Sequence, residues 1–145
     1  MQHCKPILLV EDDAADVMIV KHAFNDLKIT NPLVHTSDGE EALEYLRDET
    51  NKRPIIILLD LNMPRMNGFE FLKAVKADKS LRKIPVIVLT TSDADQNIVE
   101  SYELSAAGYI VKPVDYKQFV EAVKTIDVYW SLNRLPNSAY CHTAC

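Results

Sequence analysis

Five side chains able to do chemistry stand where short apolar runs of this chain end. They are Glu11, Asp12, Asp60, Thr90 and Lys112. Asp60 stands out among them because it follows the unbroken apolar run 55–59. Burying a carboxylate at the tip of an apolar segment costs free energy unless a ligand or a counter-charge pairs with it. The pattern therefore indicates that a strand delivers Asp60 to a shared site.

An oxygen-rich metal site is the first chemistry that this set allows. Glu11, Asp12 and Asp60 would repel one another on neighbouring strands, and a hard divalent cation would relieve that repulsion. Mg²⁺ takes about six oxygens, usually from one or two carboxylates together with waters and a phosphate. The backbone carbonyl of Asn62 could complete the coordination. The three acids therefore predict a Mg²⁺ site.

Acceptance of a phosphoryl group is the reaction that the remaining side chains suit. A carboxylate can attack phosphorus and form an aspartyl phosphate. Such a transfer depends mainly on positioning and on charge neutralisation. The Lys112 ammonium would neutralise one phosphoryl oxygen, and the Thr90 hydroxyl would donate to another.

The apolar runs also predict the elements that bring these groups together. Strands are expected at 7–10, 33–34, 55–59, 86–89 and 109–111. Amphipathic stretches with helical spacing lie between them. Strands that are apolar on both faces and alternate with helices indicate an α/β fold, a doubly wound parallel sheet with helices on both faces. The ligand crevice of such a sheet lies at the carboxyl ends of its strands, where the five side chains would meet.

Capping residues mark the ends of the predicted helices. Asp13 is expected to cap the first helix rather than to bind a ligand, and Ser37 or Asp38 is expected to cap the second. The fourth helix is expected to end with Gly108 as its C-terminal cap. Asp115 is expected to open the fifth helix.

Composition is that of an ordinary single-domain globular protein. The chain has 145 residues, 26% of them charged, and a formal net charge of −5 at pH 7. No dense basic patch suggests nucleic-acid binding, and no apolar run approaches the roughly 20 residues of a membrane span. Because no signal peptide is visible, the cytoplasm is the expected location. Cys4, Cys141 and Cys145 predict neither a disulfide framework nor a zinc site.

Four segments of the chain resemble the signatures of a known signalling family. The segments "ILLVEDD", "LLDLNMPRMNG", "PVIVLTT" and "AAGYIVKPV" are similar, in order and spacing, to those of the response-regulator receiver domain of two-component signalling. The polar insert at 50–53 and the ending "VYWSLNRLP" resemble the single-domain regulators that partner cyanobacterial phytochromes. The resemblance implies a flavodoxin-like fold with strand order 2-1-3-4-5, a receiver domain over 5–132 and a C-terminal extension over 133–145.

The resemblance also implies a role for each site residue. Asp60 becomes the phosphoacceptor, Asp12 a direct Mg²⁺ ligand and Glu11 a ligand through water, with Asn62 contributing its carbonyl. The chain would then not be an enzyme, beyond its own phosphorylation and slow autodephosphorylation.

A conformational switch is a further implication of the resemblance. Thr90 and Lys112 would contact the phosphoryl group, and Tyr109 would turn from solvent toward the core as Thr90 moves inward. The bond between Lys112 and Pro113 is expected to be cis, and Gly68 is expected to allow the turn after the phosphorylation loop.

The partners implied by the resemblance are proteins. A sensor histidine kinase, a phytochrome, would supply the phosphoryl group. Because the chain ends soon after the fifth helix, no DNA-binding domain is expected. A homodimer is expected through the surface of the fourth helix, fifth strand and fifth helix, together with the extension 129–135, which includes Tyr129 and Trp130.

Two other classes of protein stay open at this stage. Some Mg²⁺-dependent phosphatases of related fold use a strand-tip aspartate as nucleophile, but they need a second Asp two residues later as general acid. This chain has Asn62 at that position. A degenerate receiver that serves only for dimerisation is the other class, and it would not need the intact set of Asp12, Asp60, Thr90 and Lys112.

Overall fold

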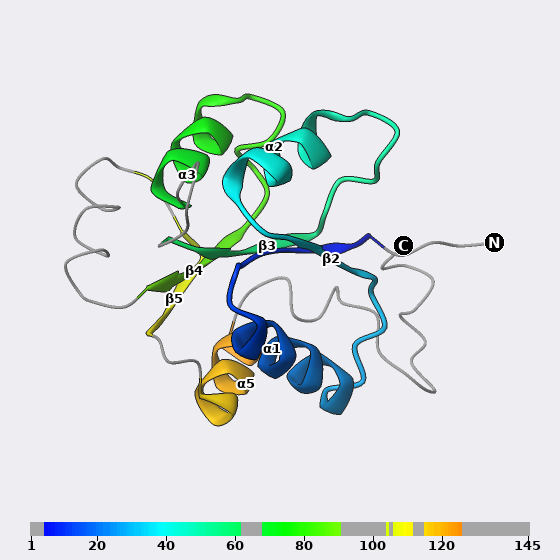
Figure 1. Ribbon diagram of the computed structural model, residues 1–145, viewed down its shortest axis with the longest axis vertical. Coiled ribbons are helices and arrows are strands. Elements are labelled where there is room, and N and C mark those ends of the chain that lie inside the picture. Colours follow the sequence, from blue (N-terminus) through cyan, green and yellow to red (C-terminus); the bar gives the residue numbers. More distant parts are fainter. Residues whose placement is uncertain (1–4, 62–67, 91–103, 105, 112–114, 126–145) are drawn as a thin grey trace.

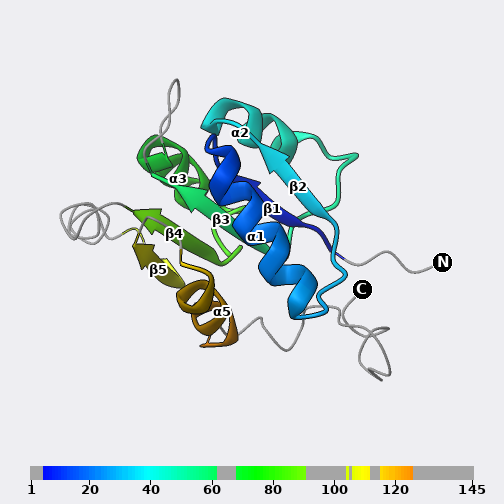
Figure 2. The same cartoon turned by 60° about the horizontal axis from the view of Figure 1, so that its bottom comes forward.

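A parallel sheet of five strands forms the centre of the structure, which is a computed structural model (Figure 1). The structure describes residues 5–61, 68–90, 104, 106–111 and 115–125. The strands are β1 (Ile7–Val10), β2 (Leu33–Thr36), β3 (Ile56–Asp60), β4 (Val86–Thr90) and β5 (Gly108–Val111). The helices of the described part are α1 (Ala14–Asp26), α2 (Gly39–Arg47), α3 (Gly68–Ala77) and α5 (Tyr116–Thr125). The strand order β2-β1-β3-β4-β5 confirms the expected flavodoxin-like fold, and Figure 2 shows β2 and β5 at its two edges.

Helices cover both faces of this sheet, with α2 and α3 on one face and α1 and α5 on the other (Figure 1). Successive strand residues point to opposite faces, so each strand feeds two cores. Ile7 and Leu9 pack with α1 and α5, whereas Leu8 and Val10 pack with α2 and α3. Full burial of one such side chain contributes roughly 1.5–3 kcal/mol. This burial on both faces explains why the central strands read as unbroken apolar runs.

The register between β1 and β3 brings two of the predicted acids to the same edge. Val10 is paired with Leu59 in parallel. The next residues along the two strands are Glu11 and Asp60, which therefore stand side by side where β1 and β3 end. This is the arrangement expected for a site at the carboxyl ends of parallel strands.

Aspartate caps open three of the helices, as predicted. Asp13 accepts hydrogen bonds from the backbone at the start of α1, and Asp38 accepts one from the backbone N–H of Glu41 in α2. Asp115 likewise accepts a hydrogen bond from the backbone N–H of Gln118 at 3.1 Å. These side-chain oxygens satisfy N–H groups that have no partner inside the helix.

Two other expectations need correction. β2 is longer than the predicted 33–34. Its last two residues, His35 and Thr36, pair with β1, but they are polar and so do not extend the apolar run. Gly108 is not a helix C-cap. It begins β5, and no glycine in the described residues has the positive φ that such a cap requires. The predicted fourth helix lies outside the described residues, and so does the extension 129–135.

No helix in the described part of the chain is long and apolar enough to cross a membrane.

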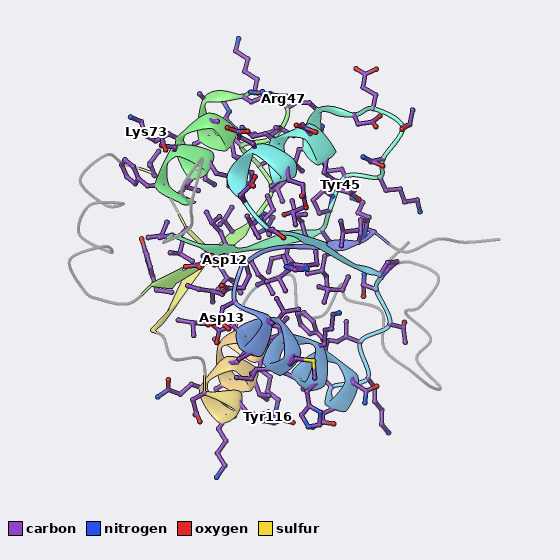
Figure 3. All side chains as sticks on the ribbon, viewed as in Figure 1. Asp12, Asp13, Tyr45, Arg47, Lys73 and Tyr116 are labelled. Carbon is purple, nitrogen blue, oxygen red and sulfur yellow. The ribbon has the colours of Figure 1, made fainter. Side chains whose placement is uncertain are left out.

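A polar contact and an aromatic contact join α1 to α5 on one face of the sheet. The Tyr116 hydroxyl donates a hydrogen bond to the Asp26 carboxylate, and Figure 3 shows Tyr116 at the side of the molecule where the two helices lie. Beneath it the rings of Phe24 and Phe119 meet edge to face, with centroids 5.7 Å apart. The hydrogen bond to Asp26 raises the pKa of the Tyr116 phenol, and partial burial and the Asp26 charge add to this effect.

We expect Tyr116→Phe to lower the stability of the domain near neutral pH and to have less effect in alkaline solution. A raised folded-state pKa means that the contribution of the phenol is fully present below the ordinary tyrosine pKa of about 10 and is lost as the pH rises through the raised value. The variant should therefore be less stable than the wild type near neutral pH, and the difference should shrink above about pH 10. Urea unfolding of both proteins at neutral and alkaline pH measures this, and a difference independent of pH would contradict it.

Candidate functional site

Three carboxylates converge at the carboxyl edge of the sheet. Glu11, Asp12 and Asp60 each offer an oxygen, and these oxygens all lie within 4.8 Å of one another. Glu11 and Asp60 are fully buried, whereas Asp12 is exposed. Figure 3 shows Asp12 with Asp13 where the chain leaves β1 for α1. The cluster therefore opens to solvent on the side of Asp12.

Backbone and side-chain contacts hold Glu11 at the end of β1. Its N–H donates to the carbonyl of Thr36 at 3.0 Å, which extends the ladder between β1 and β2 by one bond. Its carbonyl lies 2.6 Å from Nε2 of His35. Its Oε2 accepts a hydrogen bond from the backbone N–H of Asp13 at 3.1 Å. Asp13 itself caps α1 and is not a member of the acidic cluster, as the sequence predicted.

A close approach of the backbone supports Asp60 from the other side. Asp60 pairs with Leu89 of β4, and the N–H of Gly68 donates to the carbonyl of Leu61 at 3.1 Å. A Cβ atom added to Gly68 would lie only 2.1 Å from the carbonyl oxygen of Asp60 and 2.4 Å from Cα of Leu61. Gly68 is therefore needed to leave space for the Asp60 backbone, and not to supply a left-handed turn.

The donor set of the cluster fits a hard divalent cation. All three groups are carboxylates, and no His or Cys belongs to this cluster in the described residues. Ions such as Mg²⁺ and Mn²⁺ prefer oxygen ligands of this kind, and a cation would offset the mutual repulsion of three close negative charges. An acidic metal-binding site is therefore present, with Glu11, Asp12 and Asp60 as the residues that would hold the ion.

The other predicted site residues are placed only in part. Thr90 ends β4, next to β3, and is paired with Val111 of β5. Tyr109 of β5 is partly buried and packs against the core between the sheet and the α2–α3 layer. The side chain of Thr90 lies outside the described part of the structure, and so do Asn62, Lys112 and Pro113. The proposed roles of these four residues and of Tyr109 therefore stay predictions.

Reasoning from the sequence missed His35 and Thr36 as neighbours of the site. Both are polar residues at the carboxyl end of β2, so the rule that picked out the other strand ends applies to them as well. The apolar run stops at Val34, so hydropathy alone does not extend the strand to them.

The comparison with protein families identifies the chain. A model of the response regulator receiver domain matches residues 7–124. The chain belongs to the response-regulator receiver family. Members of this family do not act as classical enzymes.

Two relatives are similar over most of the chain. "Probable methanogenesis regulatory protein FilR2" of Methanothrix harundinacea is 39% identical, over 92% of this chain and 88% of its own length. Response regulator Rcp1 of Synechocystis sp. is 38% identical, over 87% of this chain and 88% of its own length.

Solved structures of phytochrome response regulators are similar to this receiver domain. The bacteriophytochrome response regulator RtBRR has a TM-score of 0.81 and 39% identity, covering 97% of this chain and 88% of its own. The Mn²⁺-bound form of Rcp1 has a TM-score of 0.74 and 37% identity, with coverages of 93% and 99%. The phosphorylated cyanobacterial phytochrome response regulator RcpA has a TM-score of 0.73 and 40% identity, with coverages of 89% and 94%.

We expect Gly68→Ala to destabilise the receiver domain by about 2–3 kcal/mol, because the new methyl group would overlap rigid backbone at Asp60. Gly108→Ala is the matched control, since a Cβ there would meet nothing within 4 Å. The control should be neutral or more stable by up to about 1 kcal/mol. Urea unfolding gives both values, and equal stability of the two variants would contradict the steric argument.

We also expect Mg²⁺ to raise the melting temperature of the wild type. An ion that binds only the folded state at 100 times its Kd adds about 2.7 kcal/mol of stability. Asp12→Asn should lose most of this gain, because it removes a charged oxygen ligand from the cluster. Asp13→Asn is the control, since asparagine caps helices about as well as aspartate and Asp13 lies outside the cluster. A melting temperature independent of Mg²⁺ in the wild type would rule out the metal site.

Proposed function

We propose that this chain is a phosphoacceptor response regulator in which Asp60 receives a phosphoryl group from a sensor histidine kinase, with Mg²⁺ as the cofactor. The observation that carries the proposal is the convergence of buried Asp60 with Glu11 and Asp12 at the carboxyl edge of a receiver sheet. A relative crystallised with Mn²⁺ and another in its phosphorylated form support the metal and the phosphorylation.

Asp60 is the acid best suited to accept the phosphoryl group. It is the last residue of β3, which is paired on both sides, by β1 and β4, so its backbone is held firmly. A carboxylate oxygen of Asp60 would attack phosphorus while the bond from phosphorus to the histidine nitrogen of the kinase breaks and leaves its electron pair on that nitrogen. Asp12 is exposed and follows the end of β1, which suits a metal ligand at the mouth of the site.

The remaining site residues serve this transfer through charge. A bound Mg²⁺ would neutralise the negative charge of the carboxylates and of the incoming phosphoryl group. Glu11, Asp12 and Asp60 would hold that ion, with the backbone carbonyl of Asn62 as a further ligand. The Lys112 ammonium and the Thr90 hydroxyl would hold the other phosphoryl oxygens. The observation that supports these roles is the mutual proximity of Glu11, Asp12 and Asp60.

The switch would signal by changing the surface of the domain around β5. Phosphorylation would draw Thr90 inward and let Tyr109 move, since the two residues lie on the adjacent strands β4 and β5. Tyr109 is partly buried against the α2–α3 side of the core. A local charge event would in this way bias a bistable element at the β5 side of the molecule.

We propose a phytochrome as the kinase, because several similar solved structures are phytochrome response regulators. The cytoplasm is the proposed location, since the phosphoryl group of such a kinase comes from ATP. The homodimer through the fourth helix, β5, α5 and the extension 129–135 stays a prediction, as do the receiver limits 5–132 and the tail 133–145.

A small-molecule phosphodonor tests the central claim. Incubation with acetyl phosphate and Mg²⁺ should add the mass of one phosphoryl group to the intact wild-type protein, and Asp60→Asn should remain unmodified. Asp13→Asn should label as the wild type does, because it keeps the acidic cluster whole. A wild type that stays unlabelled would favour a degenerate receiver, and labelling of Asp60→Asn would place the phosphoacceptor elsewhere.

A further inference from the structure

The peptide group that joins Glu11 to Asp12 is held by the end of β2. His35 of β2 places its Nε2 2.6 Å from the carbonyl oxygen of Glu11. The next residue, Thr36, accepts the N–H of Glu11 at 3.0 Å, and its hydroxyl donates to the carbonyl of Leu9 at 3.3 Å. Two consecutive residues of β2 therefore bind the backbone of Glu11 on both its N–H and its C=O sides.

The direction of the hydrogen bond from His35 follows from its partner. A backbone carbonyl can only accept, so Nε2 must carry the hydrogen, whichever charge state the ring has. The distance of 2.6 Å is shorter than the usual N–H···O length of about 2.9–3.0 Å. His35 therefore acts as a donor to the loop that follows β1.

The carbonyl of Glu11 controls the position of two acids at once. β1 ends at Val10, so Glu11 lies beyond the last residue of the strand proper. Because the peptide group is planar, fixing the Glu11 oxygen also fixes the direction in which the chain continues to Asp12. Asp12 is exposed, and its carboxylate completes the three-acid cluster. An anchor at this carbonyl therefore acts on the cluster without touching any of its carboxylates.

We propose that His35 is a positioning residue for the metal-binding acids, acting through its Nε2–H on the carbonyl of Glu11. The side chain of His35 is exposed and belongs to an edge strand, so it adds little to the hydrophobic core. Its hydrogen bond is instead with the backbone that carries Glu11 and Asp12. Groups that orient metal ligands in this way commonly change metal affinity by 10–100-fold when they are removed. The proposal rests on the proposed function in assuming that the cluster binds a divalent cation.

Binding of Mn²⁺ alone, measured by isothermal titration calorimetry, is the direct test. His35→Ala should weaken Mn²⁺ binding by about tenfold relative to the wild type. His35→Gln, whose amide N–H can still donate, should recover part of the loss. His22→Ala is the matched control, because His22 lies on α1, near Asp26 and away from the cluster, and it should bind Mn²⁺ as the wild type does.

Labelling by acetyl phosphate separates positioning from general destabilisation. The Mg²⁺ concentration for half-maximal labelling should rise about tenfold in His35→Ala, while the rate at saturating Mg²⁺ should stay within about twofold of the wild type. Equal Mn²⁺ affinity of the wild type and His35→Ala would overturn the positioning role and leave the proposed function intact. A wild type that binds no Mn²⁺ would overturn both. A loss of rate that saturating Mg²⁺ does not restore, or one that His35→Gln shares fully, would also overturn the positioning role.

Discussion

The parallel pairing of β1 with β3 is the constraint on which the rest of this structure depends. Val10 opposite Leu59 makes Glu11 and Asp60 neighbours, although they are far apart in the sequence. Side chains alternate between the faces of a sheet, so a slip by one residue would exchange the side chains of β3 between the two cores and move Asp60 out of line with Glu11. Burial on both faces makes such a slip costly, because helices cover the sheet on each side. The same apolar packing that stabilises the domain therefore sets the separation of its acids.

Bringing like charges together is the cost of this arrangement. Two buried carboxylates and an exposed third lie with oxygens within 4.8 Å, so the fold works against their mutual repulsion. A cation would offset that repulsion, which favours its binding. Neighbouring residues help to hold the carboxylates in place. Asp13 and Thr36 bind the backbone or the carboxylate of Glu11, and Gly68 admits the backbone close to Asp60. The site is thus held mainly by main-chain interactions.

Local patterns predicted most of the elements, and the misses have physical causes. The strand 7–10 and the caps Asp13, Asp38 and Asp115 follow from apolar runs and from side chains that bond within three residues. β2 came out too short because an edge strand can carry polar residues and still pair. Gly108 was misread because a glycine at the end of a predicted helix also suits the first residue of a strand, and only its φ distinguishes the two.

The sequence by itself determined the fold class and the acids of the site, since both depend on the order of apolar runs and on the residues that end them. Tertiary structure alone decided how those acids are held. The hydrogen bond between His35 and Glu11 joins residues 24 positions apart, and the approach of Gly68 to the Asp60 carbonyl depends on where the backbone returns to the strand. Neither contact leaves a periodic signal, because each arises from strand register and chain path rather than from the preferences of neighbouring residues.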